Sequence, residues 1–125
     1  MTADNHKTGS FGEEYVAEFL KRHGYEIIGR NYRVKGGEID VIARKDDVIA
    51  FVEVKTRKTG ALTSGEEAIT SDKRKHIITA AERFLSEYGE DINGRFDVAA
   101  VDMDIKNYRV VGMRYYKNAF DASNI

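Results

Sequence analysis

Two charged residues stand at alternate positions at the end of an apolar segment. Residues 48–55 read VIAFVEVK, so Glu53 and Lys55 close a run that is otherwise nearly all apolar. Alternate residues of a strand share a face, and burying an unpaired charge is costly. If residues 48–56 form a strand, a carboxylate and an ammonium therefore leave the same side of a buried sheet.

The segment before this strand places a second carboxylate opposite the first. If residues 46–47 form a two-residue turn, the numbers of cross-strand partners sum to 93, which sets Asp40 opposite Glu53 and Glu38 opposite Lys55. Directly opposed side chains have Cβ atoms about 4.5–5.5 Å apart. Two like charges at that distance repel, so this register predicts a compensating cation.

A divalent metal is a suitable cation, because Mg²⁺ is typically held by one or two carboxylates together with water and phosphate oxygens. A metal on Asp40 and Glu53 would polarise a phosphodiester and lower the pKa of a bound water. Lys55 would orient that water or stabilise charge on the phosphate. The alternative is a pair of cross-strand salt bridges on an exposed face. The residues alone leave both open, and the apolar neighbours favour a site.

A helix over residues 9–23 precedes these strands. Ser10 with Glu13 three residues later has the capping-box pattern, and Gly24 is a natural stop. Helical spacing puts Glu13 at the edge of the apolar face and Glu14 toward water. Glu13 has two competing roles, the cap and a place in the site, and its position alone favours the cap.

The remaining elements follow from periodicity and from the turn residues. We expect the order α-β-β-β-α-β-β, a central mixed sheet flanked by two helices, with a loop over 57–65 and a fraying tail over 117–125. Asp97 is expected to pair with an arginine for structural reasons. The expected strand over residues 38–44 should carry Ile39, Val41 and Ala43 on one side. The expected strands are residues 26–33, 38–44, 48–56, 95–103 and 108–115, and the second helix is residues 71–88.

Composition fits one domain over residues 1–125, with its core at about 9–116. The chain has no cysteine, so it has neither disulfides nor a thiolate metal site. No apolar run approaches the roughly 20 residues that span a bilayer, and the polar start lacks a signal-peptide core. We therefore expect a cytoplasmic protein that does not enter a membrane. The formal net charge of −1 gives no support for nucleic-acid binding.

Basic residues do gather around the second helix. Arg57, Lys58, Lys73 and Arg74 are the residues that we expect to contact nucleic acid, with Lys73 at the edge of the helix's apolar stripe. For each of them alone, a solvated surface residue is the more common explanation.

Residues 37–40 (GEID) and 51–57 (FVEVKTR) resemble the signature of the PD-(D/E)XK nuclease superfamily. The closer resemblance is to the YraN-like family of predicted endonucleases, which is related to the archaeal Holliday-junction resolvases. It extends from about residue 9 to residue 101. The ordered set that carries it also includes Gly12-Glu13, Gly24-Tyr25, Asn31-Tyr32-Arg33, Glu67-Ala68, Lys73 and Arg95-Phe96-Asp97.

This resemblance implies an α/β, restriction-endonuclease-like αβββαβ core. It implies that Asp40 and Glu53 bind Mg²⁺ or Mn²⁺, that Lys55 assists catalysis and that Glu13 completes the acidic site. The family's Phe-Gly and Pro that follow the Glu-x-Lys arginine are replaced here by residues 62–63 (LT) and Gly65.

The implied function is a metal-dependent endonuclease that hydrolyses phosphodiester bonds in DNA, including branched or recombination and repair structures. A homodimer would place two sites on two strands. The alternative is a non-catalytic module on the same fold that binds nucleic acid or another protein.

Overall fold

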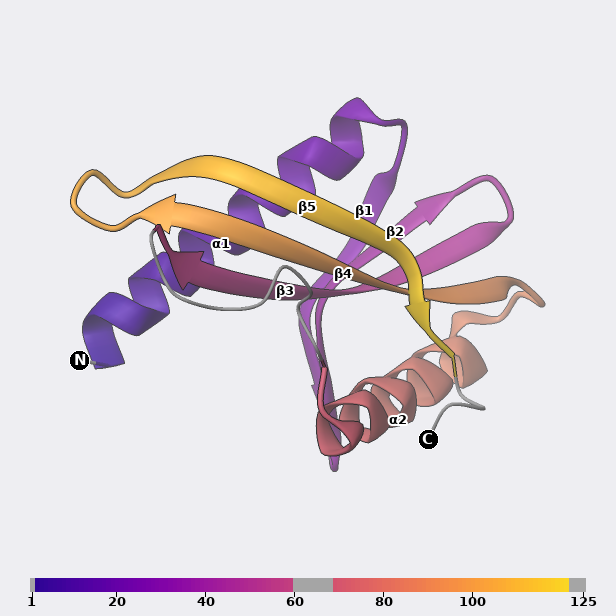
Figure 1. The fold of residues 1–125 in the computed structure, drawn as a ribbon. Coiled ribbons are helices and arrows are strands. Elements are labelled where there is room, and N and C mark those ends of the chain that lie inside the picture. The colour runs from indigo at the N-terminus through magenta and orange to yellow at the C-terminus, as the bar shows by residue number, and fades with distance from the viewer. Residues whose placement is uncertain (1, 60–68, 122–125) are drawn as a thin grey trace.

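Two helices enclose a five-stranded mixed sheet (Figure 1). The computed structural model describes residues 2–59 and 69–121, with side chains described from residue 10 onward. The strands lie in sequence order, and only β3 and β4 run parallel. This arrangement confirms the expected αβββαβ core with one additional strand. The elements are α1 (Thr2–Arg22), β1 (Glu26–Val34), β2 (Gly37–Lys45), β3 (Val48–Lys58), α2 (Ser71–Tyr88), β4 (Asn93–Asp104) and β5 (Arg109–Phe120).

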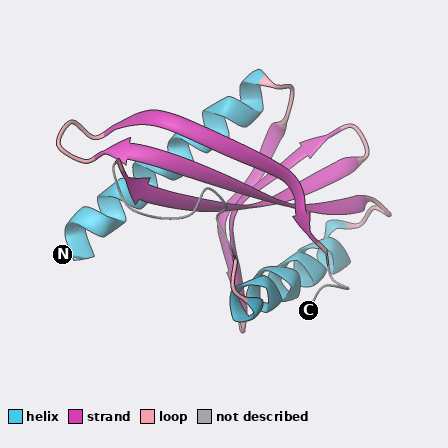
Figure 2. Cartoon of the chain, in the orientation of Figure 1, coloured by secondary structure: helices cyan, strands magenta, loops and turns pink. Residues whose placement is uncertain are grey.

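Each helix covers one face of the sheet (Figure 2). The central strand β3 explains why both are needed, because its side chains are buried on both sides. Ala50 and Val52 pack into the cluster beneath α1, whereas Ile49 and Phe51 pack into the cluster beneath α2. A strand buried on both faces reads as a continuous apolar run, as this one does.

The hairpin between β2 and β3 has the expected register over only part of its length. Its turn lies at residues 46–47, and partner numbers sum to 93 from Lys45–Val48 to Val41–Val52. The ladder ends there, and beyond it β3 continues beside β4 while the first residues of β2 lie beside β1 and close to α2 (Figure 1). We call this point of separation the fork.

The fork overturns two expectations about β2. Glu38 is paired in register with Arg33 of β1 and does not lie opposite Lys55. Ile39 packs in the cluster under α2, whereas Val41 packs under α1, so the two do not share a face. Asn31 of β1 lies between their partners Arg30 and Tyr32 and has a positive φ of 51°, so the strand pair is irregular at this point.

The ends of two elements also differ from expectation. Helix α1 begins at Thr2, so Ser10 lies inside it and cannot cap it. Strand β5 extends to Phe120, which is buried and stacks on Phe96 with ring centroids 5.0 Å apart. That burial explains why residues 117–120 belong to the sheet rather than to a frayed tail. Residues 60–65 of the expected loop, the Glu67-Ala68 motif and residues 122–125 lie outside the described residues.

Asp97 is fully buried in β4, and its partners satisfy both carboxylate oxygens. Arg95 contacts it at 2.8 Å, which confirms the expected pairing. The hydroxyl of Tyr115 and the backbone N–H of Asn118 donate to it at 2.7 and 2.9 Å, and Arg95 also donates to Tyr25 at 2.7 Å. The network thus joins the segment after α1 to β4 and β5, and buried charge is tolerated when it is paired in this way.

Among the described residues, no helix is both long and apolar enough to cross a lipid bilayer.

Gly37 sets how closely α2 approaches β2, which yields a test. A Cβ at this position would lie 2.4 Å from the backbone oxygen of His76 and 2.8 Å from the backbone nitrogen of Ala80. Helix α2 must move to accommodate it, so Gly37→Ala should lower the free energy of unfolding by about 1–3 kcal/mol. Urea denaturation measures this change.

Gly112→Ala is the matched control, because its Cβ would meet nothing closer than a side-chain oxygen of Asp102 at 3.7 Å. This substitution should leave stability unchanged or raise it slightly, since glycine weakens a strand. Equal stability of the two variants would contradict the proposed close contact.

Candidate active site

Asp40 lies at the fork, one residue beyond the last pair of the β2–β3 ladder. Beyond the ladder, its side chain takes the place of a backbone acceptor, because the backbone N–H of Val54 donates to Asp40 Oδ2 at 2.8 Å. Burial raises the pKa of Asp40, although the hydrogen bonds from Val54 and Glu53 oppose that effect. The fork therefore holds a carboxyl group whose charge is poorly solvated.

Glu53 shares this environment and is the more deeply buried of the two, with 7% of its surface exposed. Its carboxyl group lies beside the carboxyl group of Asp40. Burial and the neighbouring charge of Asp40 raise its pKa to about 8, and Lys73 offsets only part of that rise. Glu53 Oε1 is buried and has no hydrogen-bond partner among residues 2–59 and 69–121. A salt bridge on an exposed face, the alternative weighed from sequence, does not describe this group.

Lys73 approaches the two carboxylates from the first turn of α2. Thr70 caps that turn by accepting the Lys73 backbone N–H at 3.1 Å. The ammonium lies 3.5 Å from Glu53 Oε2 and 3.2 Å from Glu38 Oε2. Partial burial lowers the pKa of Lys73, but the negative charges of Glu53 and Glu38 and the hydrogen bond to Glu38 outweigh it, so the net pKa is raised. Lys73 is thus turned toward the acidic group.

Glu13 points to the site from α1 and has no capping role, because the helix begins eleven residues earlier at Thr2. Burial and then the charge of Asp40 raise its pKa, whereas a hydrogen bond with the side chain of Asn31 lowers it. Asn31 has a φ of 51°, a backbone conformation that asparagine adopts more readily than most residues. The structure therefore brings Glu13 near Asp40, while Glu14 is exposed and pairs with Arg30 at 2.8 Å.

Close contact between α1 and β3 supports this placement of Glu13. A Cβ on the preceding residue, Gly12, would lie 2.2 Å from the side-chain oxygen of Thr56. A larger residue would require Thr56 to change its rotamer or the helix to move away from the strand.

Lys55 follows Glu53 by two residues, so alternation places it on the same face of β3. It is half-buried and makes no hydrogen bond or ion pair with any of the residues that the structure describes. Lys73, rather than Lys55, forms the ion pair with Glu53.

The four residues expected to contact nucleic acid do not form one continuous surface. Arg57 pairs with Asp102 at 2.7 Å, and Lys58 leaves the opposite face of β3. Lys73 faces the carboxylates, and the buried Nε of Arg74 has no hydrogen-bond partner in the described part of the chain. Contact with nucleic acid stays a prediction for each of them.

Few carboxylates converge at the fork. Within residues 2–59 and 69–121, no group of three or more histidine, aspartate or glutamate side chains is placed to hold a metal ion. Mg²⁺ needs fewer protein ligands, because it usually keeps several waters. The orphaned Oε1 of Glu53 and its nearness to the Asp40 carboxyl fit such a cation, which would relieve their repulsion.

Sequence reasoning missed Asn31 and Arg33 as neighbours of the site, and it set Glu38 opposite Lys55 rather than beside Lys73. Arg33 lies 3.6 Å from Glu38, which in turn contacts Lys73. The Gly36-Gly37 pair was the available signal, because a tight turn there pairs the end of β1 with the start of β2.

Comparison with known proteins places similar sequences in many bacteria. The profile of an uncharacterised protein family, UPF0102, matches residues 12–101. A UPF0102 protein of Caldicellulosiruptor saccharolyticus is 45% identical over 90% of this chain and 95% of its own length. Relatives in Chlorobium phaeobacteroides and Prosthecochloris aestuarii are 41% and 48% identical, over 98% and 81% of this chain and 99% and 80% of their own lengths.

The raised pKa of Glu53 predicts a specific pH dependence of stability. Its pKa rises from 4.5 to about 8 on folding, so the folded protein holds a proton that the unfolded chain has released. The stabilisation is complete below pH 4.5 and is lost as the pH approaches 8. Without divalent metal, the free energy of unfolding should fall across this range, and Glu53→Gln should remove much of the fall. Urea titrations at a series of pH values measure both slopes.

Glu18→Gln is the control, because Glu18 pairs with Lys21 and not with a residue of the site. It should keep the wild-type slope. An unchanged slope in Glu53→Gln would show that Glu53 is not the group responsible.

Proposed function

The chain belongs to the UPF0102 family, the YraN-like family of the sequence resemblance, and we propose that it is a metal-dependent endonuclease hydrolysing phosphodiester bonds in DNA. One observation carries the proposal. Asp40 and Glu53 are held together at the fork, with an unpartnered carboxylate oxygen on Glu53. Two buried carboxyl groups held close together destabilise the fold, and a bound cation would offset their repulsion.

Asp40 and Glu53 would hold Mg²⁺ or Mn²⁺. The ion would supply an activated water at neutral pH and neutralise charge on the phosphate. Asp40 is oriented for this by the Val54 N–H, which fixes one carboxylate oxygen at 2.8 Å. Glu53 carries its second oxygen unpartnered, as a ligand position requires.

The other charged groups assist in distinct ways. Lys73 stays protonated because the neighbouring glutamates raise its pKa, so it lowers the repulsion between the carboxylates. Lys55 has no partner among the described residues, which leaves its ammonium able to stabilise charge that develops on a phosphate oxygen. Glu13 adds a third carboxyl from α1, close enough to Asp40 for their charges to interact.

DNA is the proposed substrate, with branched, recombination and repair structures as the class suggested by the family resemblance. A symmetric pair of chains would act on two strands at once.

Cleavage of a labelled panel tests the activity. The panel holds single-stranded, duplex, flap and four-way-junction DNA, each with Mg²⁺ or Mn²⁺. We expect cutting of at least one substrate, reduced about 100-fold or more in Asp40→Asn and Glu53→Gln. Calorimetry should show divalent-metal binding that both variants lose. Glu18→Gln is the matched control and should retain cutting, because its carboxyl lies outside the site.

Two other outcomes would refute the nuclease. DNA binding without cutting, unchanged in the Asp40 and Glu53 variants, would identify a binding module. An absence of both metal binding and DNA binding would favour a protein-interaction domain.

The proposed role of Glu13 has its own test. Glu13→Gln should reduce cutting by about 10- to 100-fold, as loss of a group that supports metal ligands does. The free energy of unfolding should not fall, because burial disfavours the charge that the substitution removes. Parallel kinetics and urea denaturation separate the effects. Full activity with lowered stability would assign Glu13 a structural role only.

A further inference from the structure

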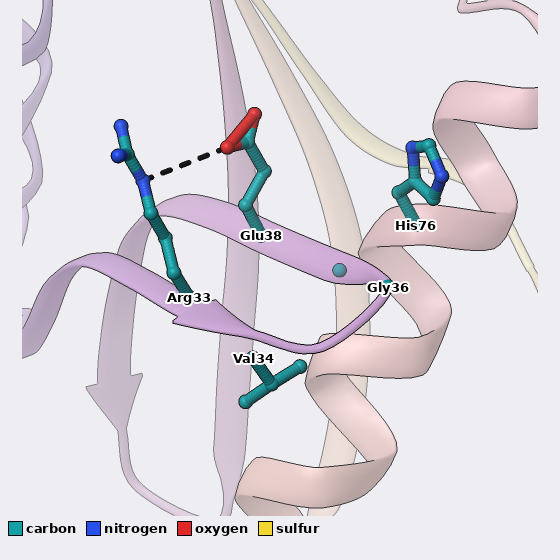
Figure 3. Close-up of a pocket in the computed structure, with 6 residues that line it drawn as sticks. Arg33, Val34, Gly36, Glu38 and His76 are labelled. Carbon is teal, nitrogen blue, oxygen red and sulfur yellow. Dashed lines mark ion pairs between the residues drawn. The ribbon is translucent and has the colours of Figure 1, made fainter.

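A hollow of about 350 Å³ lies beside the fork, between the β1–β2 hairpin and the first turns of α2 (Figure 3). It is continuous with the candidate site through shared contacts, because Glu38 in its wall is bound to Lys73, and Lys73 contacts Glu53. The hollow is lined by Arg33, Val34, Gly36, Gly37, Glu38 and His76.

Two of the lining side chains offer hydrogen-bond donors or positive charge to a ligand. Arg33 is 74% exposed, and its Nε is 3.6 Å from Glu38, a separation too wide for a good hydrogen bond. A guanidinium has five N–H donors, so the others remain available. His76 lies on α2, across the hollow from Arg33 (Figure 3), and is exposed. Its ring makes no hydrogen bond or ion pair with a described residue.

Glu38 projects between these two residues (Figure 3). One of its oxygens faces Arg33, and the other accepts a hydrogen bond from Lys73 at 3.2 Å. The Glu38 carboxylate thus lies between Arg33 and Lys73 and partly neutralises both. A phosphate presents the same kind of acceptor oxygens to arginine and lysine, and arginine binds phosphate and carboxylate with the same planar donor geometry.

We propose that this hollow binds a backbone phosphate of a nucleic-acid strand, adjacent to the phosphate at Asp40 and Glu53, and that Glu38 occupies its cations until the strand displaces it. The inference rests on the proposed function, since it places the same substrate beside the same carboxylates. Arg33 is the principal contact, and His76 lines the opposite wall.

Removing the Glu38 charge should strengthen binding more than removing an equally exposed charge elsewhere, because Glu38 contacts Arg33 and Lys73 directly. Glu38 competes with the phosphate for Arg33 and Lys73, so removing its charge frees Arg33 and leaves Lys73 paired with Glu53. Glu38→Gln should therefore tighten binding, whereas Arg33→Ala should weaken it. A specific phosphate contact also changes the salt dependence of binding, because each one releases about one counterion.

Binding of a fluorescein-labelled oligothymidylate to the full chain tests the subsite, by anisotropy without divalent metal and at several salt concentrations. We expect Arg33→Ala to weaken binding about tenfold, as loss of a charged hydrogen bond does. It should also lower the slope of log affinity against log salt by about 1. Glu38→Gln should tighten binding several-fold.

The Arg83–Glu87 pair of α2 supplies matched controls, because it is also an exposed arginine–glutamate ion pair, at 2.8 Å. Arg83→Ala and Glu87→Gln should change neither the affinity nor the slope. NMR gives the location, since the ring signals of His76 should shift as the oligonucleotide is added to the wild-type chain. They should shift less in Arg33→Ala at the same concentration.

The outcomes separate this inference from the nuclease proposal. Binding that Arg33→Ala and Glu38→Gln leave unchanged, or that does not move the His76 signals, overturns the subsite. An absence of binding without metal overturns it as well, and cutting with Mg²⁺ would then still support the nuclease. Binding that depends on Arg33, combined with no cutting under any condition, keeps the subsite and removes the nuclease.

Discussion

The close approach of two buried carboxyl groups at the fork is the constraint around which the rest of the site is arranged. Asp40 and Glu53 lie side by side, and burial raises the pKa of both. Such a pair persists only where the surrounding structure compensates for it. The Val54 N–H and the Lys73 ammonium provide part of that compensation. Glu53 Oε1 has no hydrogen-bond partner among the described residues, and the proposed metal ion would bind there.

The fold creates this proximity by separating two strands that began as a hairpin. Parallel pairing holds β3 beside β4 along its full length. The first residues of β2 separate from β3 and lie against α2. Gly37 permits that contact, because any side chain there would meet the helix backbone. Thr70 caps the same helix and fixes the turn from which Lys73 extends. The hairpin and α2 therefore position the acidic and basic groups as one unit.

Basic side chains gather around the candidate site although the net charge of the chain is slightly negative. The formal net charge is −1, yet Arg33, Lys73 and Lys55 lie around the carboxylates. Glu38 binds two of these cations in the free protein, so they add little to a long-range positive field. A chain of this kind would attract nucleic acid weakly from a distance and bind it through short contacts at the site. In the proposed subsite, a phosphate replaces the Glu38 carboxylate at these cations, next to the proposed metal site at the fork.

Local sequence patterns predicted the order of the elements, the β2–β3 turn and the grouping of Asp40 with Glu53, because local periodicity and a two-residue turn fix strand register over short distances. The sequence also singled out Glu13, though its position alone favoured a cap. Long-range packing sets the end of the ladder at Val41–Val52, which turns Glu38 away from Lys55. It likewise decided that α1 begins early and that Lys73 points inward. These features depend on how helices pack against a twisted sheet, and such packing is set by contacts between distant residues that no local pattern records.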